Sequence, residues 1–250
     1  MTATHEKYWE ALDEASRASR WVPFRRAIHS ILDAIEFDAL YFLAPVVADR
    51  RIGRVVWNIG FPRELEALYK KAGWKTDPLP DIALNRTNAF RFSDAPRLTK
   101  LDNRQRAFLE QLGEGVAVHC TGPYARAGFV GVARPKNPDL DDALVRKVQV
   151  AAQLCFQRYC EIAGSHYEQP PDLSQRELDV IRWIGEGKSN AVIADILGIT
   201  KNSVDSYVKR IFAKLGVSDR TAAAVRAVAL GLIATGKHSK QAAHRVRWKT

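Results

Sequence analysis

The sequence contains little cysteine and no long apolar run, and both shortages narrow what the chain can be. Its 250 residues include three cysteines, Cys120, Cys155 and Cys160. An odd number without metal-like spacing argues against a disulfide framework or a zinc site, so we expect reduced, mostly buried thiols. No segment approaches the roughly 18 to 20 apolar residues that cross a membrane, and the polar N-terminus lacks a signal-peptide core. We therefore expect a cytoplasmic protein.

Signatures of catalysis are missing as well. The sequence has no P-loop, no nucleophile elbow and no paired-carboxylate cluster that would hold a catalytic metal. We therefore expect a protein that is not an enzyme, with no catalytic residue, no metal and no cofactor. A DNA-processing enzyme is the alternative that these absences disfavour.

What the sequence does carry is an uneven positive charge. Residues 172–250 hold 14 Lys and Arg against 7 Asp and Glu, whereas the preceding 171 residues hold 24 against 21. A basic region behind a nearly neutral one favours nucleic acid as the partner of the C-terminal part. The N-terminal part is then expected to have a different partner.

A break in the helical pattern separates these two parts. The stretch GSHYEQPPDLSQRE (164–177) contains the pair Pro170-Pro171, which is incompatible with a continuing helix. Ser174 followed by Glu177 is the capping-box signature of a new helix. The basic residues at the C-terminal end of the chain either contact phosphate or form a solvated end. We predict a first domain over 1–163, a linker over 164–173, a second domain over 174–235 and a basic tail over 236–250.

The N-terminal domain mixes helical and strand-like periodicity. Helical spacing of apolar residues occurs at 6–20, 23–36, 62–73, 101–112 and 138–163. Short strand-like runs occur at 38–45, 54–61, 89–92, 115–120 and 127–133. Five short strands with clustered helices predict an α+β fold, an α-β-α sandwich around a mainly antiparallel five-stranded sheet.

The C-terminal domain is predicted to be an all-α, four-helix unit. Its first helix begins at Ser174 and ends near Gly185–Gly187, and its fourth, 221–233, is rich in Ala and Val and suits packing against a copy of itself. Between them, in GKSNAVIADILGITKNSVDSYVKRI (187–211), Ser189 and Thr200 begin two helices and Gly198 supplies a left-handed turn. This pattern fits either an ordinary helical hairpin or a helix-turn-helix that reads DNA. The residues of the second helix expected to face inward are Val192, Ile193, Ile196 and Leu197.

Residues around this hairpin favour the second interpretation. Leu173-Ser174-x-Arg176-Glu177, Gly187-Lys188-Ser189, Leu197-Gly198-Ile199 and Lys214-Leu215-Gly216-Val217 with Arg220 resemble the DNA-binding domain of LuxR-type regulators. By that resemblance, the base-reading positions are Asn202, Asp205 and Lys209. Asp205 would either accept from a cytosine amino group or hold Lys209 or Arg210 in place. The expected phosphate or flanking contacts are Lys201, Ser203, Ser206 and Arg210.

The N-terminal domain resembles the autoinducer-binding domain of quorum-sensing regulators over residues 8–163. The resemblance rests on Phe61-Pro62, Tyr69, Asp77-Pro78 and the Gly-rich stretch LGEGVAVHCTGP (112–123). A response-regulator receiver is disfavoured, because two helices precede the first strand and the acidic pocket of a receiver is missing. The resemblance implies an N-acyl homoserine lactone as ligand, with Asp77 accepting from its amide N–H and Tyr69 donating to its acyl carbonyl. The expected pocket walls are Phe61, Leu65, Leu79, Phe92, Phe129 and Gly131.

Three of these wall positions depart from the family pattern. Leu65 stands where the family has a Trp that donates to the lactone carbonyl, and Phe92 replaces a second pocket Trp. Gly131 stands where a Ser or Thr hydroxyl often meets the acyl carbonyl. The candidates for a replacement polar group are Tyr41, Trp57 and His119.

We therefore expect a ligand-responsive transcription regulator that binds palindromic double-stranded DNA as a homodimer and acts with RNA polymerase. Two alternatives stay open. The first keeps the architecture but binds a different small molecule or none, and it is motivated by Leu65 and Gly131. The second is a protein-interaction module with a basic tail.

Overall fold

The computed structural model describes residues 3–44, 55–61, 63, 67, 76–123, 126–163 and 170–233. The chain divides into two units, residues 1–166 and 167–250, and each has its own apolar core. None of the helices in these ranges is long and apolar enough to cross a bilayer. The two units are described separately below.

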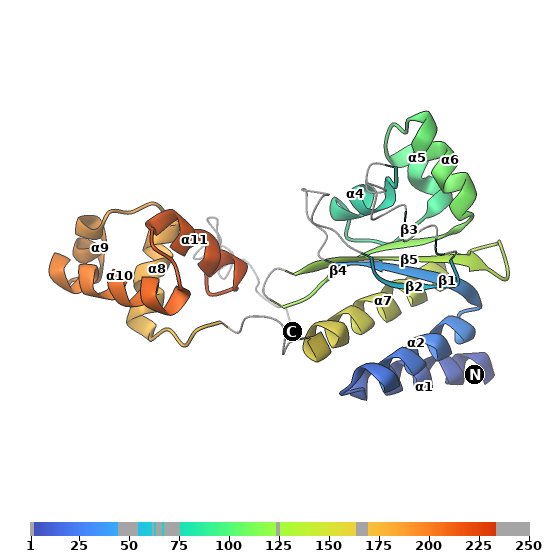
Figure 1. Cartoon of the computed structure of the whole chain (residues 1–250), viewed down its shortest axis with the longest axis horizontal. Coiled ribbons are helices and arrows are strands. Elements are labelled where there is room, and N and C mark those ends of the chain that lie inside the picture. The colour runs from blue at the N-terminus through green and yellow to red at the C-terminus, as the bar shows by residue number, and fades with distance from the viewer. Residues whose placement is uncertain are drawn as a thin grey trace, which may run out of the picture. The chain divides into compact units, whose positions relative to one another are not determined.

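A five-stranded antiparallel sheet forms the centre of the first unit (Figure 1). Every neighbouring pair of strands is antiparallel. In this register Gly131 lies between Tyr41 on one neighbouring strand and Ala117 on the other. In spatial order the strands are β2 (Val55–Ile59), β1 (Phe37–Leu43), β5 (Ala127–Pro135), β4 (Gly115–Thr121) and β3 (Phe90–Arg91).

Helices cover both faces of this sheet (Figure 1). Because side chains alternate along a strand, Leu40 and Phe42 of β1 pack into one helical layer, whereas Ala39, Tyr41 and Leu43 pack into the other. The predicted α-β-α sandwich with a mainly antiparallel sheet is confirmed. The first layer consists of α1 (Ala3–Arg17), α2 (Trp21–Ala34) and α7 (Asp142–Ile162). The second consists of α4 (Leu79–Leu84), α5 (Ala95–Leu98) and α6 (Asn103–Leu112), with a short 3-10 turn at Phe92–Asp94.

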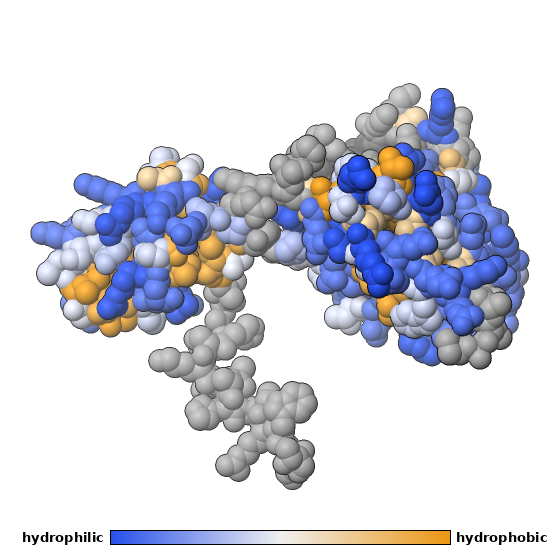
Figure 2. All heavy atoms as spheres, turned by 90° about the horizontal axis from the view of Figure 1, so that it is seen from below, coloured by the Kyte–Doolittle hydropathy of each residue, from blue (hydrophilic) through white to orange (hydrophobic). Residues whose placement is uncertain are grey.

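The outer surface of the first layer is mainly hydrophilic, with hydrophobic areas between the hydrophilic ones (Figure 2). The large apolar side chains exposed on these helices are Trp9, Trp21, Val22 and Val150. Exposed apolar residues of this kind are common on protein surfaces, so they do not by themselves define a binding site.

Two short helices of the second layer are not predicted by the sequence pattern. α4 follows Pro78 and contains Pro80, and α5 contains Pro96. Proline near a helix start is tolerated, but in a sequence it also marks loops, and elements this short show no helical period. Of the predicted helix over 62–73, residues 63 and 67 lie within the described ranges, and both are helical.

The cysteines of this unit are free thiols. Cys120 and Cys160 are buried and Cys155 is half-buried. Burial raises the pKa of Cys155 to about 12, so this thiol is uncharged at neutral pH. All three behave as small apolar groups of the core, as expected for reduced thiols.

Four helices form the described part of the second unit, residues 170–233. Gly198 and Gly216 end the second and third helices with φ angles of 65° and 64°, a left-handed conformation that glycine adopts without strain. Ser174, Ser189, Thr200 and Asp219 cap the four N-termini, each accepting from the backbone N–H three residues further on. The helices are α8 (Gln175–Gly185), α9 (Asn190–Leu197), α10 (Lys201–Leu215) and α11 (Arg220–Ala229).

One detail of α9 differs from the prediction. Ile193 is buried and Leu197 half-buried, but Val192 and Ile196 are 42% and 43% exposed. α9 has eight residues and packs chiefly on α10, so it buries one narrow face. The expectation that all four residues face inward is wrong for Val192 and Ile196.

Candidate functional site

Asp77 is a buried carboxylate on the α4 side of the sheet. Its side chain is 2% exposed. The backbone N–H of Leu79 donates to Oδ1 over 2.9 Å, and the hydroxyl of Tyr41 donates to Oδ2 over 2.9 Å. A carboxylate removed from water needs such donors, because burial without them is strongly unfavourable. The two bonds fix the plane of the Asp77 carboxylate at the start of α4.

Tyr41 reaches Asp77 because Gly131 leaves room for its ring. The two residues face each other across β1 and β5. A Cβ atom placed on Gly131 would lie 2.7 Å from Cζ of Tyr41 and closer still to its Cε1. The ring is fully buried and packs against Phe129 and Phe61, with centroid distances of 5.4 Å and 5.7 Å. A side chain at Gly131 and the observed position of Tyr41 are therefore mutually exclusive.

Of the three candidates for a replacement polar group, Tyr41 is the one that the structure places at Asp77. Trp57 packs against the core on the opposite face of the sheet, in contact with Phe24. His119 lies near Thr87 and Gln149, and burial lowers its pKa. The Tyr41 hydroxyl therefore lies next to Asp77, on the strand that neighbours Gly131.

The other predicted pocket residues divide into two groups. Leu79, Phe92 and Phe129 are buried in the core cluster that contains Tyr41, and Phe61 is half-buried against that cluster. Leu65 and Tyr69 lie outside the described residues. The described members of the predicted set therefore come together on one face of the sheet.

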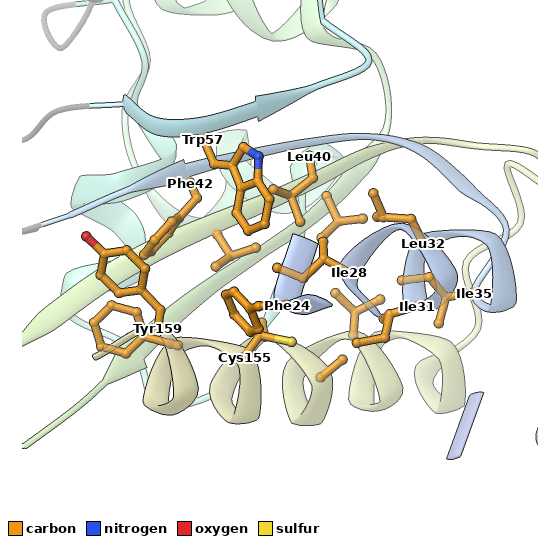
Figure 3. A pocket seen from close by; sticks show the side chains of 16 residues that line it. Phe24, Ile28, Ile31, Leu32, Ile35, Leu40, Phe42, Trp57, Cys155 and Tyr159 are labelled. Carbon is orange, nitrogen blue, oxygen red and sulfur yellow. The ribbon is translucent and has the colours of Figure 1, made fainter. Parts of the chain in front are cut away.

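A cavity between the sheet and the helices α2 and α7 lies on the opposite face (Figure 3). Its volume is about 50 Å³. Ligand pockets occupy roughly 300–1,000 Å³ and present a few polar groups. This cavity is too small for an acylated lactone, and apolar side chains surround it. The labelled residues around it are Phe24, Ile28, Ile31, Leu32, Ile35, Leu40, Phe42, Trp57, Cys155 and Tyr159.

In the second unit, α10 presents the predicted DNA-contacting residues. Among the described residues, the side chains of Asn202 and Lys209 have no hydrogen-bond or ion-pair partner. Ser203 is engaged at the helix start, where its hydroxyl lies 2.9 Å from that of Thr200. The exposed members of the set are Lys201, Asn202, Ser206, Lys209 and Arg210, and the half-buried ones are Ser203 and Asp205.

Asp205 belongs to a hydrogen-bond network that joins three helices. Its Oδ1 accepts from the Asn190 amide over 2.7 Å, and its Oδ2 lies 3.6 Å from the Lys201 ammonium. Asn190 in turn accepts from Arg220 over 2.8 Å, and Arg220 also donates to the carbonyl of Lys188. The hydrogen bond from Asn190 and the charges of nearby lysines lower the pKa of Asp205. The ion-pair partner of Asp205 is Lys201, not Lys209 or Arg210 as one alternative held.

Arg210 is paired within the unit as well. Its Nε lies 3.5 Å from Oε1 of Glu177, and its guanidinium lies 4.6 Å above the ring of Tyr207. Glu177 is 3% exposed, and its Oε2 accepts from Lys214 over 2.7 Å. Burial alone would raise the pKa of Glu177, but the hydrogen bonds from Lys214 and Ser174 lower it. The sequence analysis identified Glu177 as part of a capping box and of a family motif, but missed this buried ion pair.

The first unit thus carries a buried carboxylate site, and the second carries a basic helix-turn-helix. This combination is typical of DNA-binding regulators that have a separate input domain. The family described as "Autoinducer binding domain" matches residues 23–159, more than half of the chain. The family described as "Bacterial regulatory proteins, luxR family" matches residues 171–227. The chain belongs to the LuxR family of quorum-sensing transcription regulators, with an autoinducer-binding domain in front of the DNA-binding domain.

Relatives and solved structures agree with this assignment. RpaR of Rhodopseudomonas palustris, a quorum sensing-dependent transcriptional regulator, is 27% identical over 178 residues, which cover 70% of this chain and 73% of RpaR. The transcriptional activator BjaR1 of Bradyrhizobium diazoefficiens is 27% identical over 231 residues, 88% of this chain and 94% of BjaR1. Some matches are partial, since this chain spans 38% of the length of y4qH of Sinorhizobium fredii. The crystal structure of Escherichia coli SdiA shares the fold, with a TM-score of 0.71, 22% identity and coverage of 92% of this chain and 99% of SdiA.

Proposed function

We propose that this regulator binds an N-acyl homoserine lactone on the Asp77 side of its sheet and binds promoter DNA through α10. The observation that carries the proposal is the buried Asp77 carboxylate, which accepts from the hydroxyl of Tyr41, whose ring packs in turn against Phe61 and Phe129. A buried acceptor at an aromatic wall suits a small ligand that has one N–H donor and an apolar body.

The chemistry of such a lactone matches these groups. An ionised carboxylate has about four acceptor positions, and the ligand amide N–H would take one of those on Asp77. A hydrogen bond to a charged acceptor contributes about 1.5–3 kcal/mol. Tyr69 would donate to the acyl carbonyl. The apolar walls of the proposed site are Phe61, Leu65, Leu79, Phe92, Phe129 and Gly131.

On the DNA side, we assign base reading to Asn202 and Lys209, whose side chains are exposed and unpaired within the described part. Amide and ammonium groups on the exposed face of a recognition helix reach base edges in the major groove. For Asp205 we favour a role in holding α10 against α9 over direct base reading, because Asn190 and Lys201 already engage its carboxylate. Lys201, Ser203, Ser206 and Arg210 would contact phosphate.

The functional form would be a homodimer on a palindromic site, with half-sites about one helical turn or more apart. An exposed stripe on α11, formed by Thr221, Val225 and Ala229, supports pairing of two DNA-binding domains. Ligand that binds only the native first unit would stabilise it and raise the amount of DNA-competent protein. RNA polymerase would be the further partner at the promoter.

A second candidate function keeps the DNA binding and changes the signal. The hydroxyl of Tyr41 donates to Asp77 and so takes up one acceptor position of its carboxylate. With Leu65 in place of a donor Trp, the same architecture would then respond to a different small molecule, or regulate without one. A transcription regulator of this kind binds its operator equally well with and without lactone.

Thermal unfolding distinguishes the two candidates. Lactone at low micromolar concentration is expected to raise the melting temperature of the wild-type chain by several degrees, because it binds only the native state. Asp77→Asn removes the charged acceptor and should abolish most of that shift. Asp139→Asn, which changes an exposed carboxylate, is the matched control and should keep it.

Two outcomes decide the proposal. If no lactone shifts the wild-type melting temperature while specific DNA binding is intact, the second candidate holds. If Asn202→Ala combined with Lys209→Ala leaves specific DNA binding unchanged in a fluorescence anisotropy titration, the assignment of α10 as the recognition helix is wrong.

A further inference from the structure

Tyr41 and Gly131 form a matched pair that shapes the Asp77 side of the sheet. A Cβ at Gly131 would clash with Cε1, Cζ and Cδ1 of the Tyr41 ring, so the ring occupies the volume that any larger residue at Gly131 would need. The ring thus adds both bulk and a hydroxyl next to Asp77. Neither contribution is available from Gly131 itself.

The surroundings of the ring are closely packed. Tyr41 and Phe129 are fully buried, and their ring centroids lie 5.4 Å apart. Phe61 meets Tyr41 edge to face at 5.7 Å. Interiors packed in this way transmit any added volume to their neighbours, so an extended alkyl chain could pass this point only by displacing the ring.

We propose that Tyr41 is a specificity-determining residue that limits the regulator to lactones with short acyl chains and orients Asp77 through its hydroxyl. The proposal rests on the function proposed above. If the ligand amide bonds to Asp77, its acyl chain begins beside the Tyr41 ring, which fills the volume next to Gly131. The hydroxyl holds Oδ2 of Asp77 while the backbone N–H of Leu79 holds Oδ1. Chain length and lactone binding are then controlled by different parts of one side chain.

Two substitutions separate these parts. Tyr41→Leu removes ring and hydroxyl and opens the space, whereas Tyr41→Phe keeps the ring and removes only the hydroxyl. Tyr8→Phe is the matched control, because the Tyr8 hydroxyl is also buried and hydrogen-bonded, to the Lys147 carbonyl over 2.8 Å, but in the helical layer on the opposite face.

The experiment measures the dissociation constants of butanoyl, hexanoyl, decanoyl and dodecanoyl homoserine lactones for the full chain by calorimetry. The wild type should bind the short chains at least about tenfold more tightly than the long ones, since the additional methylene groups of a long chain would have to displace the packed Tyr41 ring. Tyr41→Leu should reverse this order. Tyr41→Phe should weaken binding of all four and keep the order, and Tyr8→Phe should change neither.

Contrary results separate this inference from the proposed function. If the wild type binds lactones but Tyr41→Leu keeps the wild-type order, the role of Tyr41 in chain length is wrong and the proposed function stands. If no lactone binds the wild type, both the role of Tyr41 and the proposed lactone binding are wrong. Should Tyr41→Leu not fold, Tyr41→Met, whose flexible side chain fills more of the space, makes the same comparison.

Discussion

At Gly131 a single methyl group has no room, because the ring of Tyr41 already fills the space. Gly131→Ala should therefore destabilise the first unit by about 1–3 kcal/mol, the usual range for overpacking a core. In a Tyr41→Ala background, Gly131→Ala should lower the unfolding free energy by less than about 1 kcal/mol, because the Tyr41 ring is absent. Urea unfolding of the four proteins in this cycle gives the coupling directly. Equal costs in both backgrounds would show that the two side chains do not compete for space.

The ion pair of Glu177 with Lys214 makes a pH-dependent contribution to the second unit. The folded-state pKa of Glu177 lies below its ordinary value, so the contribution is present above that ordinary value and is lost as the pH falls through the folded-state pKa. Glu177→Gln should cost about 1–2 kcal/mol at neutral pH, since Lys214 is partly exposed and screened. The difference in unfolding free energy from wild type should shrink as the pH falls below the ordinary pKa of a glutamate.

Glu186→Gln is the control for this prediction, because Glu186 is an exposed carboxylate in the same unit. It should follow the wild-type pH dependence of the unfolding free energy. If the difference in unfolding free energy between wild type and Glu177→Gln stays constant from neutral to acid pH, the role given to the ion pair is wrong.

At the residue scale, the sequence does not show which residues of distant strands face each other. Asp77 and Gly131 stand out in the sequence because they coincide with or depart from a family pattern. The part played by Tyr41 depends on the register of β1 against β5, which joins residues far apart in the chain. Local periodicity carries no information about register, so Tyr41 could be named as a candidate but not placed.

At the scale of elements, the network around Asp205 fixes α10 relative to α9 and α11. Asp205→Asn should lower the melting temperature of the second unit by a few degrees and weaken binding to all duplexes by a similar factor. The preference among operator variants should not change, because base reading is assigned to Asn202 and Lys209. Binding to a panel of single-base operator variants tests this. A changed preference at one base pair, without loss of thermal stability, would make Asp205 a base-reading residue.

The elements that the sequence predicts well are those whose signals are local and strong. Ser174, Ser189 and Thr200 as caps and Gly198 as a turn are all found where expected, because a cap needs only its own helix. The proline-containing α4 and α5 are missed because they are too short to show a period. The prediction that Val192 and Ile196 face inward is wrong, because the sequence does not show that α9 packs chiefly on one other helix, α10.

At the scale of the whole molecule, the account requires two copies to act together on DNA. Val225, 64% exposed on α11, is proposed to lie where the two DNA-binding domains meet. Val225→Glu should weaken binding to an inverted-repeat operator by about tenfold, roughly the equivalent of one apolar side chain that is no longer buried. Binding to a duplex with one half-site should be nearly unchanged. Equal losses on both duplexes would show that Val225 acts through folding or direct DNA contact.

The central claim, that Asp77 holds a lactone with a short acyl chain, is tested most directly by mass spectrometry of the small molecules that co-purify with the protein. Wild-type, Asp77→Asn and Asp139→Asn chains would be purified from cells supplied with an equal mixture of the four lactones named above. The account predicts a short-chain lactone, close to one per chain, on the wild type and on Asp139→Asn, and little on Asp77→Asn. No bound lactone on the wild type, or the same amount on Asp77→Asn, would contradict it.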